Sequence, residues 1–484
     1  MIQAWSGTTS WRSKALLGVV GAVLAVGIGV AAAAFPPLAL GIVAAPILLI
    51  GAFLWTDAFA LLAIGIAPVA YGFVIHTGIL DVRFSEVLWC VVFAAMALKS
   101  RAIGRPRTSA PPLVKPLVLL LGASVLSTMV SEVPAVSVRE TFQLAYLLLM
   151  FWALSAGFST PEKLRRALDV LAVATLLMAV VGLAKVVTGA SLIPSVEVFA
   201  DRGFQVETRF GGLRYAATPQ GIEVLRLDAF YQNSVETAAY VSAMIVLLAS
   251  VLSGSRVTGS RRRAVYWMAL LGAILVWMLT GSRMGYVTLA VLIVVLALMR
   301  RRTAVLIPVV AGAAMLAVAF PTLLARFQGG LGVTPGSTNA VHYAAWLDAL
   351  RMFSTKPFLG HGPGAFQEQA GYLYFGGTLT WSPVSGGVHN MLLQAAAEMG
   401  FVGFGALVWF VWALLSVLWK AVRQARGGPW LGVAEGMFLA ACALVMMNMT
   451  TNYLYKDANW TVWGLAYASA VMVGRSVGPR VSEE

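Results

Sequence analysis

The fold is decided by the stretch from residue 264 to residue 302, which reads AVYWMALLGAILVWMLTGSRMGYVTLAVLIVVLALMRRR. Its two apolar runs, 264–280 and 285–299, each approach the ~20 residues that a helix needs to cross a bilayer core. Only a short polar turn around Gly281–Arg283 separates them, and three arginines at 300–302 follow the second run at once. The pattern predicts two membrane-crossing helices joined by a tight hinge, with the arginines outside the bilayer core.

The same apolar pattern recurs along most of the 484 residues. The chain is 60% apolar and 11% charged, against roughly 25% charged residues in a soluble domain, and this composition excludes a soluble protein. It predicts an all-α polytopic membrane protein with about fourteen crossings, or about twelve if the short connectors near Pro36 and Thr56 lie in re-entrant or broken helices. The expected spans are 15–34, 38–55, 58–75, 85–98, 113–131, 138–158, 165–187, 234–253, 264–280, 285–299, 303–320, 401–419, 431–451 and 458–474.

The net charge of +14, from 34 basic and 20 acidic residues, is interpreted as a topology signal. Basic residues near the ends of membrane spans stay in the cytoplasm. With the N-terminus inside, the strongly basic connectors fall inside as well, among them 99–115, 256–263 and 300–302. Both termini are therefore expected in the cytoplasm. Attraction to anionic lipid is enough to account for the basic excess, so membrane lipid is an expected partner and nucleic acid is not.

Most of the sequence outside the apolar runs lies in two stretches, 189–233 and 321–388, which this orientation places together on the outer face. We divide the chain into N-terminal transmembrane helices at 1–200, a catalytic membrane region at 201–474 that uses both loops, and a cytoplasmic tail at 475–484. All four histidines fall on the outer side. The functional site is therefore expected there.

The second outer loop contains a predicted helix and a glycine-rich turn. Apolar residues from Val341 to Phe353 follow a helical spacing and make one apolar face, which should lie flat on the membrane or against the bundle. Pro357 ends this helix, and Gly360–Gly364 forces a tight backbone. Such a turn can cradle a phosphate through its amide groups, with Gly362 as the candidate contact, although a plain structural turn is the commoner role.

His389 lies where a helix begins, on the outer side of the membrane. Histidine is the side chain that can act as a base near neutral pH without a large pKa shift, although a lone histidine at such a place is more often structural. Glu398 is nine positions further on, which at 100° per residue points it to the opposite helix face. A metal site is therefore not expected here.

Two arginines on the outer side are candidates for binding an anion. Arg283 lies in the hinge, where its charge is costly unless it pairs with an anion or snorkels to the interface, and both interpretations stay open. Arg226 precedes the span that begins near Ser234, with Asp228 able to neutralise it locally and Arg214 nearby as a competitor.

Together these motifs resemble the O-antigen ligase and O-antigen polymerase superfamily. The span that ends Leu279-Thr280-Gly281-Ser282-Arg283 is similar to the family's Ser-Arg hinge, and Pro357–Phe366 is similar to its Pro-then-Gly-x-Gly loop. His389-Asn390 followed by Glu398-x-Gly400-x-x-Gly403 resembles its most characteristic signature. The resemblance covers roughly residues 220–470. One departure is that Arg226 leads to Asn233 without the Gly and Pro that the family often shows before that Asn.

The resemblance implies a metal-independent, inverting glycosyltransferase without a cofactor, with a GT-C-type bundle and a large periplasmic loop before the penultimate helices. Its donor is a glycan on undecaprenyl pyrophosphate at the periplasmic face of the bacterial inner membrane. The implied catalytic residues are His389, which orients or deprotonates the acceptor hydroxyl, and Arg283 and Arg226, which bind the pyrophosphate. The implied substrate-binding residues are Asn390, Asn233, Arg214, Arg351 and Gly362.

The sequence leaves the outcome of the transfer open. A polymerase joins lipid-linked repeat units into O-antigen or exopolysaccharide, with a chain-length regulator as a candidate partner. A ligase moves the finished glycan onto lipid A core or onto a protein. The long chain and its two sizeable outer loops favour a polymerase slightly. The alternative from another class, a lipid-linked-oligosaccharide flippase, is disfavoured because the predicted spans carry almost no charge at mid-depth.

Overall fold

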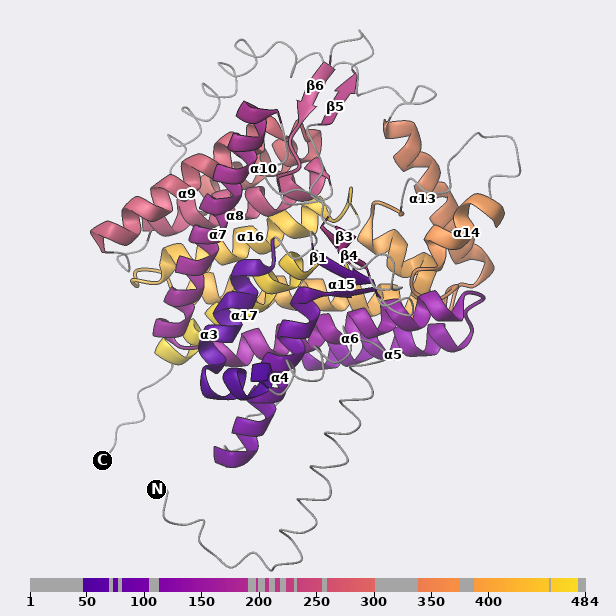
Figure 1. Ribbon diagram of the computed structural model, residues 1–484, viewed down its shortest axis with the longest axis horizontal. Helices are drawn as coiled ribbons and strands as arrows, with labels where there is room; N and C mark the ends of the chain where they lie inside the picture. The colour runs from indigo at the N-terminus through magenta and orange to yellow at the C-terminus, as the bar shows by residue number, and fades with distance from the viewer. Residues whose placement is uncertain are drawn as a thin grey trace, which may run out of the picture. The chain divides into compact units, whose positions relative to one another are not determined.

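A computed structural model of the chain (Figure 1) describes residues 47–68, 73–76, 81–103, 113–189, 197–198, 205–208, 214–217, 223–229, 233–254, 259–300, 338–373, 387–451 and 454–477. The chain forms two compact units, one made of Met1–Phe59 and Val91–Arg105, the other of Ala60–Cys90 and Pro106–Glu484. The predicted spans 15–34 and 303–320 lie outside the described residues. The candidate site lies in the larger unit.

The connector at Trp55 is a sharp bend. Helix Ile47–Leu54 meets α3 (Thr56–Ile66) at an angle of 107°. The Thr56 hydroxyl donates a hydrogen bond back to the Ala52 carbonyl at 2.7 Å, which keeps this polar side chain satisfied beside the break. The bend agrees with the prediction that this short connector lies in a re-entrant or broken helix, and both alternatives stay open.

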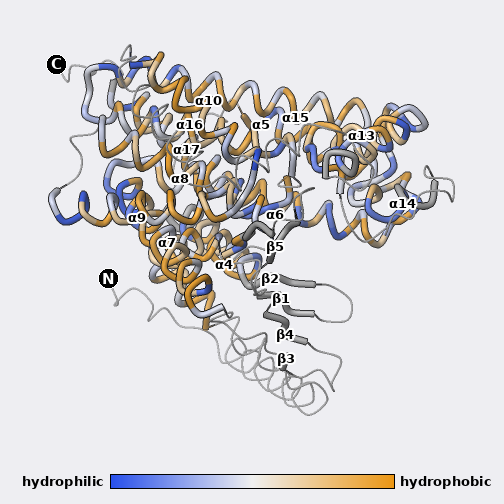
Figure 2. Tube along the Cα trace, turned by 90° about the horizontal axis from the view of Figure 1, so that it is seen from above, coloured by the Kyte–Doolittle hydropathy of each residue, from blue (hydrophilic) through white to orange (hydrophobic). Residues whose placement is uncertain are grey.

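The larger unit is built mainly from helices, and apolar residues occupy much of their length (Figure 2). The helix α4 (Phe84–Ile103) runs across the boundary between the two units. The helices that follow are α5 (Val114–Met129), α6 (Pro134–Gly157), α7 (Pro161–Thr188), α8 (Ser234–Gly254), α9 (Ser260–Leu279), α10 (Arg283–Met299), α13 (Thr338–Thr355), α14 (Ala365–Leu373), α15 (Met391–Gln424), α16 (Leu431–Met447) and α17 (Asp457–Val477).

Among the described helices, α7, α8, α9 and α15 are long and apolar enough to cross a membrane, and the bent pair at Trp55 makes a fifth if it is one span. The helices α5, α10 and α16 are apolar but shorter. The chain is thus a multi-pass membrane protein, while the count of twelve to fourteen crossings stays a prediction. Within α15 the backbone leaves the helical conformation at Gly400, so the predicted span 401–419 corresponds to the part after this break.

The helix α8 is the most buried of the candidate spans. Nearly every residue from Ser234 to Leu252 is buried. It packs closely on α16 because Gly436 has no side chain there: a Cβ at this position would lie only 2.9 Å from the Leu247 carbonyl oxygen. Small residues permit such close helix contacts in membranes, where the hydrophobic effect does not drive helices together.

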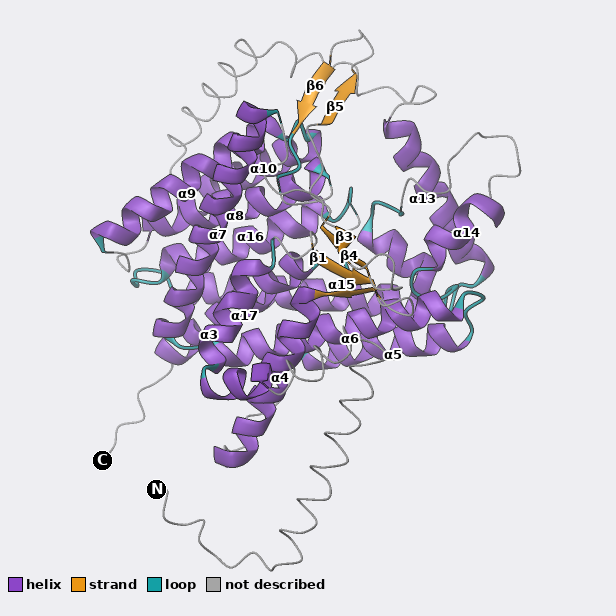
Figure 3. Cartoon of the chain, viewed as in Figure 1, coloured by secondary structure: helices purple, strands orange, loops and turns teal. Residues whose placement is uncertain are grey.

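Short strands accompany the helices (Figure 3). A four-stranded antiparallel sheet has the order β2-β1-β4-β3, and β5 pairs with β6 in a separate hairpin. The strands are β1 (Phe73–His76), β2 (Asp81–Arg83), β3 (Glu197–Val198), β4 (Gln205–Thr208), β5 (Arg214–Ala217) and β6 (Glu223–Arg226). They add to the predicted all-α fold and shorten the predicted span 58–75, whose last residues form β1. Because β1 pairs with β4, which is far away in the chain, as well as with the adjacent β2, local sequence pattern does not predict this sheet.

The helix predicted from Val341 to Phe353 is confirmed as α13, and it packs against the first part of α15 rather than standing alone. A small apolar cluster holds the two together, with Phe366 of α14 and the residue before the candidate base joining it. The buried members are Ala345, Ala349, Met352, Phe366, Val388 and Ala397. This contact brings α13 and α14 to the start of α15.

Candidate active site

His389 occupies a special backbone position immediately before α15. Its φ is +54°, in the left-handed region that histidine adopts more readily than most side chains. The next residue, Asn390, caps the helix, because its side-chain oxygen accepts hydrogen bonds from the Leu392 and Leu393 amides at 3.0 and 3.1 Å. The proposed substrate contact Asn390 is therefore first of all the residue that fixes where α15 begins.

A second histidine lies against His389. The ring of His342, on α13, meets the ring of His389 edge to face, with the centroids 4.6 Å apart and the planes at 62°. Burial lowers the pKa of His389 below its ordinary value. Burial and the charges of His389 and Arg283 together lower the pKa of His342 to about 4. Both imidazoles are therefore neutral at neutral pH.

Arg283 is the first residue of α10, directly after the hinge. The tight turn depends on Gly281, whose φ is +60°, and on Ser282, whose hydroxyl accepts a hydrogen bond from the Gly285 amide at 3.3 Å. Because the positive charge of Arg283 acts on His342, the hinge lies near the histidine pair. The structure thus brings Arg283 and His389, 106 positions apart in the sequence, to one place.

The backbone of β6 also reaches this hinge. The amide of Leu227, directly after Arg226, donates a hydrogen bond to the Leu279 carbonyl at the end of α9, at 3.0 Å. Arg214 is the cross-strand partner of Arg226 in the β5–β6 hairpin. Two of the predicted arginines therefore stand on a hairpin that is tied to the hinge carrying the third.

Asn233 and Asp228 have roles in the connection between β6 and α8. The side-chain oxygen of Asn233 accepts a hydrogen bond from the Glu236 amide at 2.8 Å, which caps α8. Asp228 was expected as a neutralising neighbour of Arg226. The structure pairs it with the buried Lys185 of α7, whose Nζ lies 2.5 Å from the Asp228 Oδ1. Lys185 is missed by the sequence analysis because it ends a long apolar run and looks like an ordinary interfacial lysine.

The backbone amides of the glycine-rich turn form hydrogen bonds within the protein. The Gly362 amide donates to the Glu398 carbonyl at 2.9 Å, and the His361 amide donates to the Ala397 carbonyl at 3.1 Å. The amides of Gly364 and Phe366 hydrogen-bond to the buried Glu398 carboxylate. This is the structural interpretation of the turn, and it leaves the Gly362 N–H engaged within the chain rather than turned toward a phosphate.

A second set of contacts connects α13 and α14 to the turn between α5 and α6. Lys356, after α13, pairs with Glu132 at 2.6 Å, and Gln369 of α14 donates to the same carboxylate at 3.1 Å. These contacts, the bond from Lys356 first, lower the pKa of Glu132. Arg351 lies further along α13, exposed and 3.6 Å from Asp348. It is nine residues, about 13 Å of helix, from His342, so the structure does not bring it to the histidine pair.

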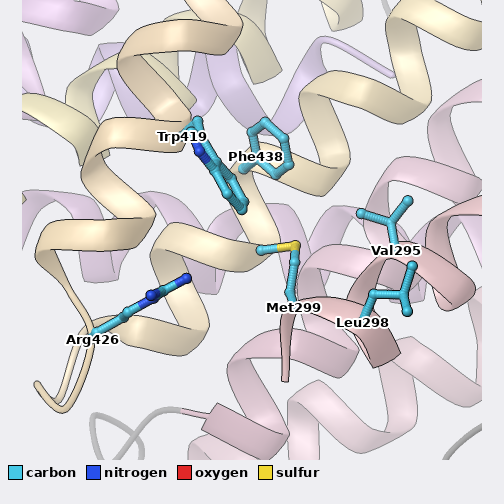
Figure 4. Close-up of a pocket in the computed structure, with 6 residues that line it drawn as sticks. All are labelled: Val295, Leu298, Met299, Trp419, Arg426 and Phe438. Carbon is cyan, nitrogen blue, oxygen red and sulfur yellow. The ribbon is translucent and has the colours of Figure 1, made fainter. Parts of the chain in front are cut away.

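A separate cavity of about 520 Å³ lies at the other end of α10 (Figure 4). It is lined by Val295, Leu298, Met299, Trp419, Arg426 and Phe438. Met299 is sixteen residues, about 24 Å of helix, from Arg283. This mostly apolar cavity is therefore distinct from the candidate active site.

A comparison with known families identifies part of the chain. Residues 267–408 match the model of the family described as O-antigen ligase. The matched region contains the hinge with Arg283, the His342–His389 pair and the glycine-rich turn, whereas Arg226 lies before it. No curated protein matches the chain. The matched region is that of a membrane enzyme of polysaccharide biosynthesis.

The buried pair of Lys185 and Asp228 predicts a specific loss of stability. Lys185→Met leaves the Asp228 carboxylate buried without this cation, which is expected to cost about 3–5 kcal/mol and to lower the Tm of the purified protein in detergent. Lys115→Met, at an exposed lysine in the first turn of α5, is the matched control and should change stability by less than about 0.5 kcal/mol. Equal Tm values for the two variants would show that the pair of Lys185 and Asp228 does not stabilise the protein.

Proposed function

We propose that the protein transfers a glycan from undecaprenyl pyrophosphate to an acceptor hydroxyl, with inversion and without a metal, at the periplasmic face of the inner membrane. The observation that carries the proposal is the convergence of Arg283, His342 and His389 at the hinge to which the β6 backbone is also bonded. The match of residues 267–408 to the O-antigen ligase family supports it.

The arginines suit a lipid pyrophosphate as leaving group. A guanidinium offers two parallel hydrogen bonds to phosphate oxygens and keeps its charge at every relevant pH. Arg283 stands at the N-terminus of α10, where the helix dipole adds positive charge. In this mechanism Arg283, with Arg226 and Arg214 on the neighbouring hairpin, stabilises the charge that develops on the departing phosphate oxygen.

His389 suits the acceptor side of the reaction. A general base has to be neutral before it accepts a proton, and burial lowers the pKa of His389, which keeps it neutral at neutral pH. In the proposed mechanism an unprotonated imidazole nitrogen of His389 takes the proton of the acceptor hydroxyl as that oxygen attacks the anomeric carbon. The bond between this carbon and the pyrophosphate oxygen breaks on the opposite face, which inverts the configuration.

We favour polymerisation over ligation as the outcome, because the chain is long and its two loops, 189–233 and 321–388, are sizeable. The acceptor is then the non-reducing end of another lipid-linked repeat unit, and a chain-length regulator is a candidate partner. In the ligase alternative, lipid A core or a protein takes the same place. The proposed orientation, with both termini in the cytoplasm, puts residues 189–233 and 321–388 on the side of the acceptor.

The proposal is tested by substitution of the two best-placed residues. Arg283→Ala and His389→Ala are each expected to lower transfer about 10²–10⁴-fold, because one removes charge stabilisation and the other the base. The assay uses purified protein in detergent, a defined undecaprenyl-pyrophosphate oligosaccharide and a glycan acceptor, with a chelator present. Arg426→Ala, at the distant cavity, is the matched control and should keep full activity. Full activity in either test variant would remove that residue from the mechanism.

The lowered pKa of His389 sets the pH dependence. Below its pKa the imidazole is protonated and cannot accept the hydroxyl proton, so activity is lost as the pH falls through this value. Because burial places the pKa below the ordinary 6.5, the acid limb of kcat/KM should have its midpoint below pH 6.5. Measurement of kcat/KM from pH 4.5 to pH 8.5 checks this, and a midpoint above pH 6.5 would exclude a buried, neutral base.

A deletion strain separates the two outcomes of transfer. If the protein polymerises, single repeat units on undecaprenyl pyrophosphate should accumulate, because nothing joins them. Mass spectrometry of extracted lipid-linked glycans measures their length. Accumulation of long lipid-linked chains instead would show that the protein ligates finished glycan and would overturn the preference for a polymerase.

A further inference from the structure

The proposed mechanism gives Arg283 and His389 a role in the reaction but gives none to His342, whose ring packs against that of the base His389. The residue comes from α13, an outer helix, and its ring reaches the site edge to face with His389 at 4.6 Å between centroids. Its Nδ1 is buried without a hydrogen bond. A polar ring held in this way costs free energy, so its placement requires an explanation.

We infer that His342 is a positioning residue whose ring packs against the imidazole of His389 and fixes the direction in which His389 faces the acceptor. The inference rests on the proposed function, because it assigns His389 the role of base.

The packing of α13 carries the first part of the argument. His342, Ala345 and Ala349 follow the i, i+3, i+7 spacing of one helix face. Ala345 and Ala349 pack in the buried cluster that contains Val388, the residue before His389. The face of α13 that carries His342 is therefore the face held against the turn on which His389 stands.

The backbone of His389 explains why such support is needed. At φ +54° the residue stands in a turn before the regular part of α15, so no preceding helical turn restricts its side-chain rotamers. An imidazole has two side-chain torsions to restrict, and a neighbouring ring at van der Waals distance restricts both. A base that is displaced by about 1 Å loses roughly 10²-fold in rate.

The electrostatics separate positioning from proton transfer. Burial, the neighbouring His389 and the charge of Arg283 each disfavour the protonated form of His342. A ring with a pKa of about 4 is too weak a base for efficient proton transfer near neutral pH, so His342 is not the group that takes the proton. The contribution of His342 is then the packing of a flat ring against His389, and another flat ring of similar size is able to supply this packing.

The anchoring of α13 makes the contact durable. At its far end, Lys356 pairs with Glu132 beside α6, and His361 bonds through Nε2 to Thr355 and to the Met352 carbonyl at 2.9 and 3.1 Å. The helix is thus held at the apolar cluster and again at its C-terminal end. Its position, and with it the position of His342, is fixed relative to α15.

The test compares His342→Ala with His342→Phe in the transfer assay. His342→Ala should lower kcat about 10–100-fold with KM for the lipid-linked donor changed less than about 2-fold, because the base is misplaced while the arginines still bind pyrophosphate. His342→Phe should recover kcat to within about 5-fold of the unchanged protein, because the phenyl ring restores the edge-to-face contact. Tyr343→Ala, at the exposed neighbour on α13, is the control and should leave both constants unchanged.

A second measurement does not depend on activity. Reaction of His389 with diethylpyrocarbonate, followed by peptide mass spectrometry, should be at least about 3-fold faster in His342→Ala than in the unchanged protein or in His342→Phe, since removal of the ring exposes the imidazole. Size-exclusion profiles and Tm values verify that the variants are folded.

The possible outcomes are distinct. Full activity of His342→Ala, or a His342→Phe as impaired as His342→Ala, would overturn the positioning role while the proposed function stands. An unchanged protein that forms no product from lipid-linked donor would overturn the proposed function, and the modification rates alone would then decide whether His342 holds the ring of His389.

Discussion

The burial of charge in an apolar helical body is the constraint on which the structure depends. A membrane protein places a charged group among its helices only with a partner, because an isolated charge there costs several kcal/mol. Three of the buried carboxylates in the described part of the bundle have cationic partners from distant parts of the chain. The pairs are Asp228 with Lys185 at 2.5 Å, Glu236 with Lys456 at 3.2 Å and Glu435 with Arg300 at 2.6 Å. Together they join α7, α8, α10, α16 and the start of α17, and two of them lie at the start of α8 near the hinge.

The same constraint explains the glycine-rich turn. Glu398 is fully buried, and the backbone amides of Gly364 and Phe366 with the Gln394 amide supply its hydrogen bonds. The amides of the turn therefore do bind a carboxyl group, but that group is a side chain of α15. Its positive φ values and the close approach of the Glu398 backbone at Gly360 require glycine. Folding of the turn onto Glu398 is what brings α13, and with it His342, to the site.

The sequence predicts best the features that depend on local pattern. Apolar runs locate the membrane helices, the polar break locates the hinge, and the spacing from Val341 to Phe353 locates α13. Features that depend on how distant elements pack together are not predicted by the sequence. Nothing in the sequence pairs His342 with His389, Lys185 with Asp228 or β1 with β4, because these contacts depend on how distant elements pack. The nine-residue count from His389 to Glu398 also assumes one regular helix, whereas His389 stands in a left-handed turn before α15.

Positive charge at the hinge serves both halves of the proposed reaction. Arg283 stands at the start of α10, and α8 and α15 also begin at residues of this site, each capped by an asparagine. Helix N-termini and a guanidinium favour the pyrophosphate anion together, so the donor is bound through fixed charge. The charge of Arg283 also disfavours protonation of His342, which in turn adjoins His389. A cation placed for the leaving group thus helps to keep His342 uncharged, and it is as an uncharged ring that His342 packs on His389. Donor binding and the neutrality of the ring beside the proposed base are in this way two consequences of one placement of charge.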